Sequence, residues 1–161
     1  MAGKLPGHSS LSQDEIIKSR KFSYGIAVAQ WNEHITDRLL QSCLQTLHQN
    51  GIPAENIKLR KTPGSFELPL TAKCLLEFEQ VNAVICLGCI IKGETDHDQY
   101  IAHAIAHGIM QLSLETGHPV IFGVLTVLSE EQALDRAGGK YGNKGEEAAI
   151  SAIKMLCLQN V

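Results

Sequence analysis

Short apolar runs alternate with amphipathic runs along most of this 161-residue chain, and this alternation limits its fold more than any other feature. The apolar runs have the length and composition of β-strands, and they occupy residues 22–30, 56–61, 82–91 and 119–127. The runs between them have the periodicity of helices that bury one face. Strand-helix-strand crossovers of this length indicate parallel strands with right-handed connections. We therefore expect an α/β fold, a three-layer sandwich in which helices cover both faces of a four-stranded parallel sheet.

We expect an N-terminal arm over residues 1–21 and one domain over residues 22–161. The arm carries glycine, proline and serine without sustained periodicity, so we expect it to be mobile or to dock on a neighbour. The apolar runs are too short to cross a bilayer and the arm lacks the apolar part of a signal peptide, so we expect a cytoplasmic protein. A net charge of −3 provides no basic field for nucleic acid.

The cysteines and histidines do not predict a metal site. Five cysteines, mostly in apolar sequence, indicate reduced thiols in the core. Cys86 and Cys89 form a CxxC motif, but their odd separation within a strand puts the two side chains on opposite faces, where they cannot bind one ion. His103 and His107 have the i, i+4 spacing of zinc-binding helices. However, Ala104 stands where such a helix carries its glutamate, and no third ligand has a suggestive spacing.

Three segments that follow predicted strands carry side chains suited to chemistry. In parallel α/β sheets, ligands bind beyond the carboxyl ends of the strands. Trp31, the only tryptophan, could stack on a planar heterocycle or simply pack at the rim. Residues 63–67, PGSFE, place Glu67 where it could contact a ligand or complement a helix N-terminus. Residues 93–97, GETDH, open a helix with a glycine, a hydroxyl and His97, which suits anion contacts and proton transfer.

A fourth segment, RAGGKYGNKGEE from Arg136, holds four glycines and three cations within ten residues and leads into a helix. It could cradle an anion or form a connector with solvated lysines. It lacks the spacing of a Walker loop, and the chain contains no G-x-G-x-x-G for a dinucleotide. A phosphate on a small molecule therefore fits this segment better than a nucleotide does.

Together these segments resemble the lumazine synthase family of riboflavin biosynthesis. The resemblance runs in order from about Phe22 to Leu156, and five motifs carry it: QWN at 30–32, PGSFELP at 63–69, LGCIIKGETDHDQYI at 87–101, PVIFGVLT at 119–126 and EQALDRAGGKYGNKGEEAA at 131–149. It implies condensation of 5-amino-6-(D-ribitylamino)uracil with 3,4-dihydroxy-2-butanone 4-phosphate to give 6,7-dimethyl-8-ribityllumazine, with no cofactor. With it we expect a flavodoxin-like strand order. The alternative is a non-catalytic carrier of flavin or pterin, or a shell protein.

The resemblance also implies roles for individual residues. His97 would transfer protons, Trp31 would stack on the pyrimidine, and Arg136 would bind the phosphate. Phe122 would reach the substrate site from a neighbouring subunit. The other substrate contacts would come from the turn residues Ser65, Phe66 and Glu67, from the strand-end residues Cys89, Ile90 and Ile91 through main-chain groups, and from the loop residues Glu94 and Thr95.

The partners implied by the resemblance are the two small-molecule substrates and further copies of the chain. Pentamers with sites between neighbours are expected. The uninterrupted GGKYGNKG turn, without the insertion of relatives that form only pentamers, favours an icosahedral 60-mer, with riboflavin synthase as an associated protein. Three features depart from the family pattern, namely Cys89, Lys92 and the pair Asp98–Gln99. The polar pair leaves open what supports His97.

Overall fold

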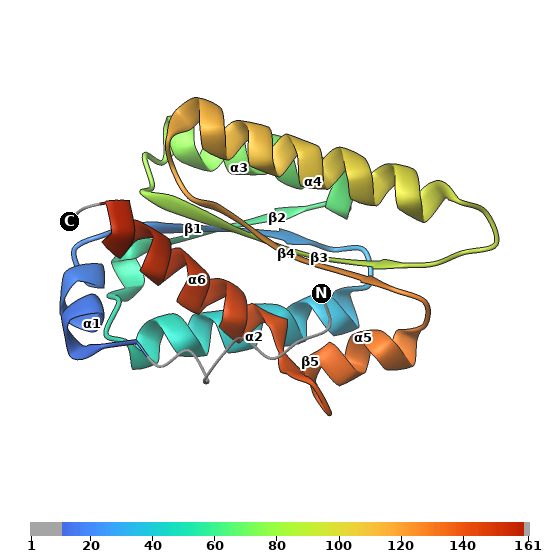
Figure 1. The fold of residues 1–161 in the computed structure, drawn as a ribbon, viewed down its shortest axis with the longest axis horizontal. Helices are drawn as coiled ribbons and strands as arrows, with labels where there is room; N and C mark the ends of the chain where they lie inside the picture. Colours follow the sequence, from blue (N-terminus) through green and yellow to red (C-terminus); the bar gives the residue numbers. More distant parts are fainter. Residues whose placement is uncertain (1–10, 160–161) are drawn as a thin grey trace.

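The computed structural model describes residues 11–159, and a four-stranded parallel sheet forms its centre (Figure 1). The strand order is β2-β1-β3-β4, with every neighbouring pair parallel. The strands are β1 (Tyr24–Ala29), β2 (Ile57–Thr62), β3 (Ala83–Ile91) and β4 (Val120–Val127). The expected α/β fold with a flavodoxin-like strand order is confirmed.

Helices cover both faces of this sheet. In Figure 1, α3 (Leu68–Phe78) and α4 (His97–Thr116) lie on one side. The helices α1 (Gln13–Ser19), α2 (Glu33–Gln49), α5 (Glu130–Arg136) and α6 (Lys144–Gln159) lie on the other. Two single turns of 3₁₀ helix, η1 (Ala54–Asn56) and η2 (Ser65–Glu67), flank β2. The three layers follow from the sequence pattern, because each long helix has one apolar face to bury and the sheet has two.

The position of each strand in the sheet explains its composition. The central strands β1 and β3 are buried at all or nearly all positions, so their sequences are almost wholly apolar. The edge strand β2 leaves Leu59, Arg60 and Lys61 exposed. Charged side chains on an edge strand discourage pairing with other chains, because a lysine or arginine resists burial.

Two apolar cores lie on the two faces of the sheet. Cys86 points into the core beneath α3 and α4, and Cys89 belongs to the core beneath α2 and α6. The prediction that the CxxC side chains lie on opposite faces is therefore confirmed. None of the helices within residues 11–159 has the length and apolar character needed to cross a membrane.

Helix α6 begins unusually close to α2. A Cβ atom at Gly145 would lie 1.9 Å from the carbonyl oxygen of Leu39, so any other residue there would push the two helices apart. Nearby, Asn143 Nδ2 donates to the carbonyl oxygen of Arg38 at 3.2 Å. These contacts hold the glycine-rich segment, which the structure folds into a small hairpin of β5 (Ala137–Gly139) and β6 (Gly142–Asn143). The sequence analysis did not predict this hairpin.

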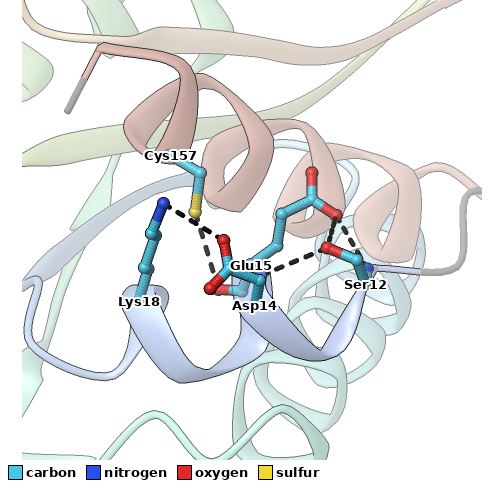
Figure 2. A network of polar contacts seen from close by, with 5 residues as sticks. All are labelled: Ser12, Asp14, Glu15, Lys18 and Cys157. Carbon is cyan, nitrogen blue, oxygen red and sulfur yellow. Dashed lines mark hydrogen bonds and ion pairs between the residues drawn. The ribbon is translucent and has the colours of Figure 1, made fainter. Parts of the chain in front are cut away.

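The segment expected to be an arm contains a helix that the sequence analysis missed. Helix α1 packs against α6, where the Cys157 thiol donates to the carbonyl oxygen of Glu15 at 3.5 Å (Figure 2). The Tyr24 hydroxyl also donates to the carbonyl oxygen of Ser19, at 3.3 Å. A helix of seven residues is too short for its periodicity to stand out from chance. The expected arm's first ten residues lie outside the described part of the chain.

Candidate active site

The structure brings eight of the predicted site residues to one cavity of about 470 Å³. The cavity lies where β1, β2 and β3 end, the position expected for a ligand site in a parallel sheet. The eight residues are Trp31, Ser65, Phe66, Cys89, Ile90, Ile91, Thr95 and His97.

The loop after β1 is tied to its neighbours on both sides. Its main-chain N–H groups donate across to the end of β2, from Gln30 to Thr62 at 2.8 Å and from Trp31 to Pro63 at 3.0 Å. On the other side, Asn32 Nδ2 donates to the carbonyl oxygen of Cys89 at 3.1 Å. Asn32 has a left-handed backbone with φ of 59°. This held loop presents the Trp31 ring, which is 73% exposed, at the cavity.

The turn after β2 places one side chain inside the cavity wall and one at its rim. Ser65 is buried, and its Oγ has no hydrogen-bond partner. It fits only because Gly88 on β3 lacks a side chain, since a Cβ there would lie 2.6 Å from Ser65 Oγ. Phe66 is 59% exposed at the rim. Glu67 does not line the cavity, and its Oε2 accepts from the N–H of Gly64 at 3.0 Å.

The loop after β3 leads into α4 at the cavity wall. His97 is the first residue of α4, and its main-chain N–H donates to Thr95 Oγ1 at 3.4 Å. The next residue, Asp98, also lines the cavity. Glu94 is exposed in the loop and does not line it. The loop therefore supplies an imidazole and a carboxylate side by side at the start of one helix.

The strand end at Cys89 offers its main chain to the cavity, while its thiol stays unreactive. Burial of the side chain, with a smaller contribution from the Glu130 carboxylate, raises the pKa of the Cys89 thiol to about 11. Thiolates, and not thiols, are nucleophiles, so Cys89 is no candidate for covalent catalysis near neutral pH.

Four predicted site residues do not line the cavity of this chain, namely Glu67, Glu94, Phe122 and Arg136. Phe122 lies in β4, where it is 41% exposed. Arg136 ends α5, with Nη1 donating to the carbonyl oxygen of Gln132 at 3.0 Å. Its guanidinium lies 4.8 Å from the centre of the Tyr141 ring, within the range of cation–π attraction.

The histidines of the HAIAH motif lie exposed on α4. Over residues 11–159, no three side chains of histidine, cysteine, aspartate or glutamate are grouped so that they could hold a metal ion.

Comparison with known proteins identifies the family. The family model for 6,7-dimethyl-8-ribityllumazine synthase matches residues 21–160. The chain belongs to this family. Within the lumazine synthase family, the protein of that name from Porphyromonas gingivalis is 47% identical over 161 residues, which covers 100% of both chains. The one from Cytophaga hutchinsonii is 53% identical over 133 residues, 83% of this chain and 84% of its own. The one from Parabacteroides distasonis is 43% identical over 156 residues, 97% and 98% of the two chains.

Five residues that line the cavity were not among the predicted site residues, namely Asn32, Gly64, Gly93, Asp98 and Ile101. Asn32 lies within the QWN motif of the lumazine synthase family, but the sequence carries no sign of its bond to Cys89. Asp98 stood out only as a departure from the family pattern. The signal available for Asn32 was its residue type, because asparagine tolerates a left-handed backbone better than most residues.

Proposed function

We propose that this protein condenses 5-amino-6-(D-ribitylamino)uracil with 3,4-dihydroxy-2-butanone 4-phosphate. The product is 6,7-dimethyl-8-ribityllumazine, and the step is the penultimate one of riboflavin biosynthesis. The observation that carries this proposal is the cavity, in which segments from three strand ends meet in a chain of the lumazine synthase family. The free state of all five cysteines suits a reducing compartment, and we propose the cytoplasm.

The chemistry of the reaction suits a site that mainly positions its substrates. An amine and a ketone form an imine once they are held together, and the later steps are loss of phosphate, ring closure and dehydration. Fixed proximity and orientation supply a large part of the rate of such reactions. The proton transfers are assigned to His97, because an imidazole can both accept and donate a proton and His97 lines the cavity. None of these steps requires a cofactor.

The pyrimidine substrate is assigned to the cavity wall. Trp31 provides an exposed aromatic face on which a planar ring stacks. The unpartnered Ser65 hydroxyl would bond a polar group of this substrate, and Phe66 and Glu67 complete the same turn. The main-chain groups of Cys89, Ile90 and Ile91 would hold the edge of the ring.

The phosphate-bearing substrate is assigned to Glu94, Thr95 and Arg136, and this assignment involves a neighbouring copy of the chain. Arg136 and Phe122 do not line the cavity of their own chain. We propose that a neighbouring copy contributes both residues, in pentamers that close as an icosahedral 60-mer. An association with riboflavin synthase would follow from such a shell. Arginine suits phosphate because its planar fork bonds two oxygens and never loses its charge near neutral pH.

The direct test mixes the purified protein with both substrates and follows the fluorescence of the lumazine product. Formation of product faster than in the mixture without protein supports the proposal. Binding of the pyrimidine substrate without accelerated product formation would instead identify a carrier. A matched control uses the protein with only one substrate, in which no product should form.

A further inference from the structure

Two buried polar side-chain atoms within residues 11–159 have no hydrogen-bond partner, and both belong to residues that line the cavity. One is Ser65 Oγ, which is assigned to the pyrimidine substrate above. The other is Oδ1 of Asp98, in the first turn of α4. A buried acceptor without a donor costs free energy on folding. Its presence in a ligand cavity therefore indicates that the donor comes with the ligand.

The groups nearest to Asp98 in the chain do not supply this donor. The side-chain amide of Gln99 donates to Asp96 Oδ1 at 3.2 Å. The main-chain N–H groups of Gln99 and Tyr100 donate to the carbonyl oxygen of Asp96. In the part of the chain that the structure describes, no ion pair includes Asp98. Within residues 11–159, Asp98 Oδ1 is therefore left without a donor of its own.

Asp98 occupies a sheltered part of the cavity wall. Together with Ile90, it separates the main cavity from a smaller one of about 180 Å³, and both residues line both spaces. The smaller space has further polar side chains, those of Gln99, His103 and Thr126. A carboxylate in this position interacts with charges more strongly than one in bulk water, because the surrounding protein has a lower dielectric constant.

The charge of Asp98 selects between the two substrates of the proposed reaction. The ketone carries a phosphate, which a nearby carboxylate repels. The pyrimidine substrate carries no phosphate and offers N–H donors, including the amine that attacks the ketone. We propose that Asp98 binds the pyrimidine substrate by accepting a hydrogen bond from this reacting amine, beside the proton-transferring His97. This inference rests on the proposed function and adds a substrate-binding residue that departs from the family pattern.

The unpaired Asp98 Oδ1 bears on the stability of the free protein as well as on substrate binding. If Asp98 Oδ1 is unpaired until substrate binds, its removal should leave the free protein as stable as before or more stable. A residue whose main role is to stabilise the start of α4 would behave in the opposite way, because a carboxylate in the first turn favours the helix. The two roles therefore predict opposite changes in the stability of the free protein when the carboxylate is removed.

The test measures the dissociation constant of each substrate separately, by calorimetry, for the full chain and for Asp98→Ala and Asp98→Asn. We expect Asp98→Ala to weaken binding of the pyrimidine substrate by about 10- to 150-fold, which corresponds to the loss of one charge-assisted hydrogen bond. Asp98→Asn keeps a neutral acceptor and should weaken binding of the pyrimidine substrate less, by about 5-fold. Binding of the ketone phosphate should be unchanged or tighter. The matched control is Glu115→Gln, which removes an exposed carboxylate from the far end of the same helix.

The unfolding temperature of each variant, measured without substrate, completes the test. Selective weakening of the pyrimidine substrate with no loss of stability supports the inference. Unchanged binding of the pyrimidine substrate in both Asp98 variants would overturn it. Equal weakening of both substrates together with a lower unfolding temperature would also overturn it and make Asp98 a structural residue. Product formation by the unaltered protein is scored separately, so a failure of the proposed function is recognised on its own.

Discussion

At the residue scale, His97 is the side chain best placed to move protons. It begins α4 at the cavity wall, and no other histidine of residues 11–159 lines this cavity. We expect His97→Ala to lower the catalytic rate by on the order of 100-fold or more, the usual range for a lost general acid or base.

The measurement for His97 is the rate of lumazine formation from pH 5 to pH 9. His107→Ala is the matched control, because His107 is exposed on the same helix and does not line the cavity. Full activity of a folded His97→Ala protein at every pH would contradict the assignment. A loss much smaller than 100-fold would mean that positioning dominates the rate.

Asn32 combines an unfavourable backbone with a bond between two strand ends. Its left-handed conformation costs most residues about 1–2 kcal/mol, and its bond to Cys89 contributes about 1 kcal/mol. Asn32→Ala should lose the bond and also bear the cost of the left-handed backbone. Asn32→Gly should lose mainly the bond, since glycine adopts this backbone readily. We expect urea unfolding to find Asn32→Ala the less stable variant. The emission of the adjacent Trp31 should change in both, and equal stability of the two variants would contradict this account.

At the element scale, helix α1 depends on the side chains that cap it. Ser12 Oγ accepts from the N–H of Glu15 at 3.2 Å, and the Glu15 carboxylate accepts from the N–H and hydroxyl of Ser12 at 2.7 and 2.9 Å (Figure 2). The same helix has an exposed ion pair, Lys18 with Asp14 at 3.1 Å. Hydrogen bonds from the Ser12 N–H and hydroxyl lower the pKa of Glu15.

These contacts predict losses of different size for two substitutions in α1. Ser12→Ala should destabilise the helix by about 1 kcal/mol, the usual cost of losing a cap. Lys18→Ala should cost less than about 0.5 kcal/mol, because exposed ion pairs contribute little. Hydrogen exchange of residues 13–19 measures the destabilisation of α1 in both variants. The opposite ranking would show that the ion pair holds the helix.

The Glu15 cap also sets a pH dependence for α1. Because the folded pKa is lowered, its contribution to stability is present above the ordinary pKa of 4.5 and is lost as the pH falls through the folded value. Acidification below pH 4.5 should therefore loosen α1 in the parent protein. Glu15→Gln should remove this part of the pH dependence. An acid transition of α1 that is the same in Glu15→Gln as in the parent protein would contradict the role of the Glu15 cap.

At the scale of the whole molecule, large apolar side chains that do not line the cavity lie exposed. Phe78 and Leu114 are 78% and 76% exposed, and Leu70 and Met110 are 66% and 60% exposed, all on α3 and α4. Helices covering one face of a sheet do not need apolar residues on their outer side. We expect these surfaces to be buried between copies of the chain.

Native mass spectrometry tests the assembly directly. A mass corresponding to sixty copies is expected at low micromolar concentration. A stable isolated pentamer would contradict only the shell, whereas a monomer would contradict the shared site as well. In a monomer, Arg136 and Phe122 would have no cavity to complete, because they do not line their own.

The order and type of the main elements, and the end of the sheet where the cavity lies, follow from the sequence pattern. Periodicity is a local property, so the four strands and the helices from Glu33 onward could be predicted to within a few residues. The position of the cavity also followed, since parallel strands bring their carboxyl ends to one edge. The motifs at those ends therefore contain all thirteen residues that line it, eight of which were predicted as site residues.

Which side chains of these motifs meet depends on packing between segments that are distant in the chain. Asn32 and Cys89 lie 57 positions apart in the chain, and their bond depends on how β1 and β3 align. The burial of the Asp98 Oδ1 atom depends on how α4 lies against β3, and the docking of α1 depends on a surface offered by α6. Contacts of this kind arise from packing between distant segments, which no periodicity within a single segment encodes.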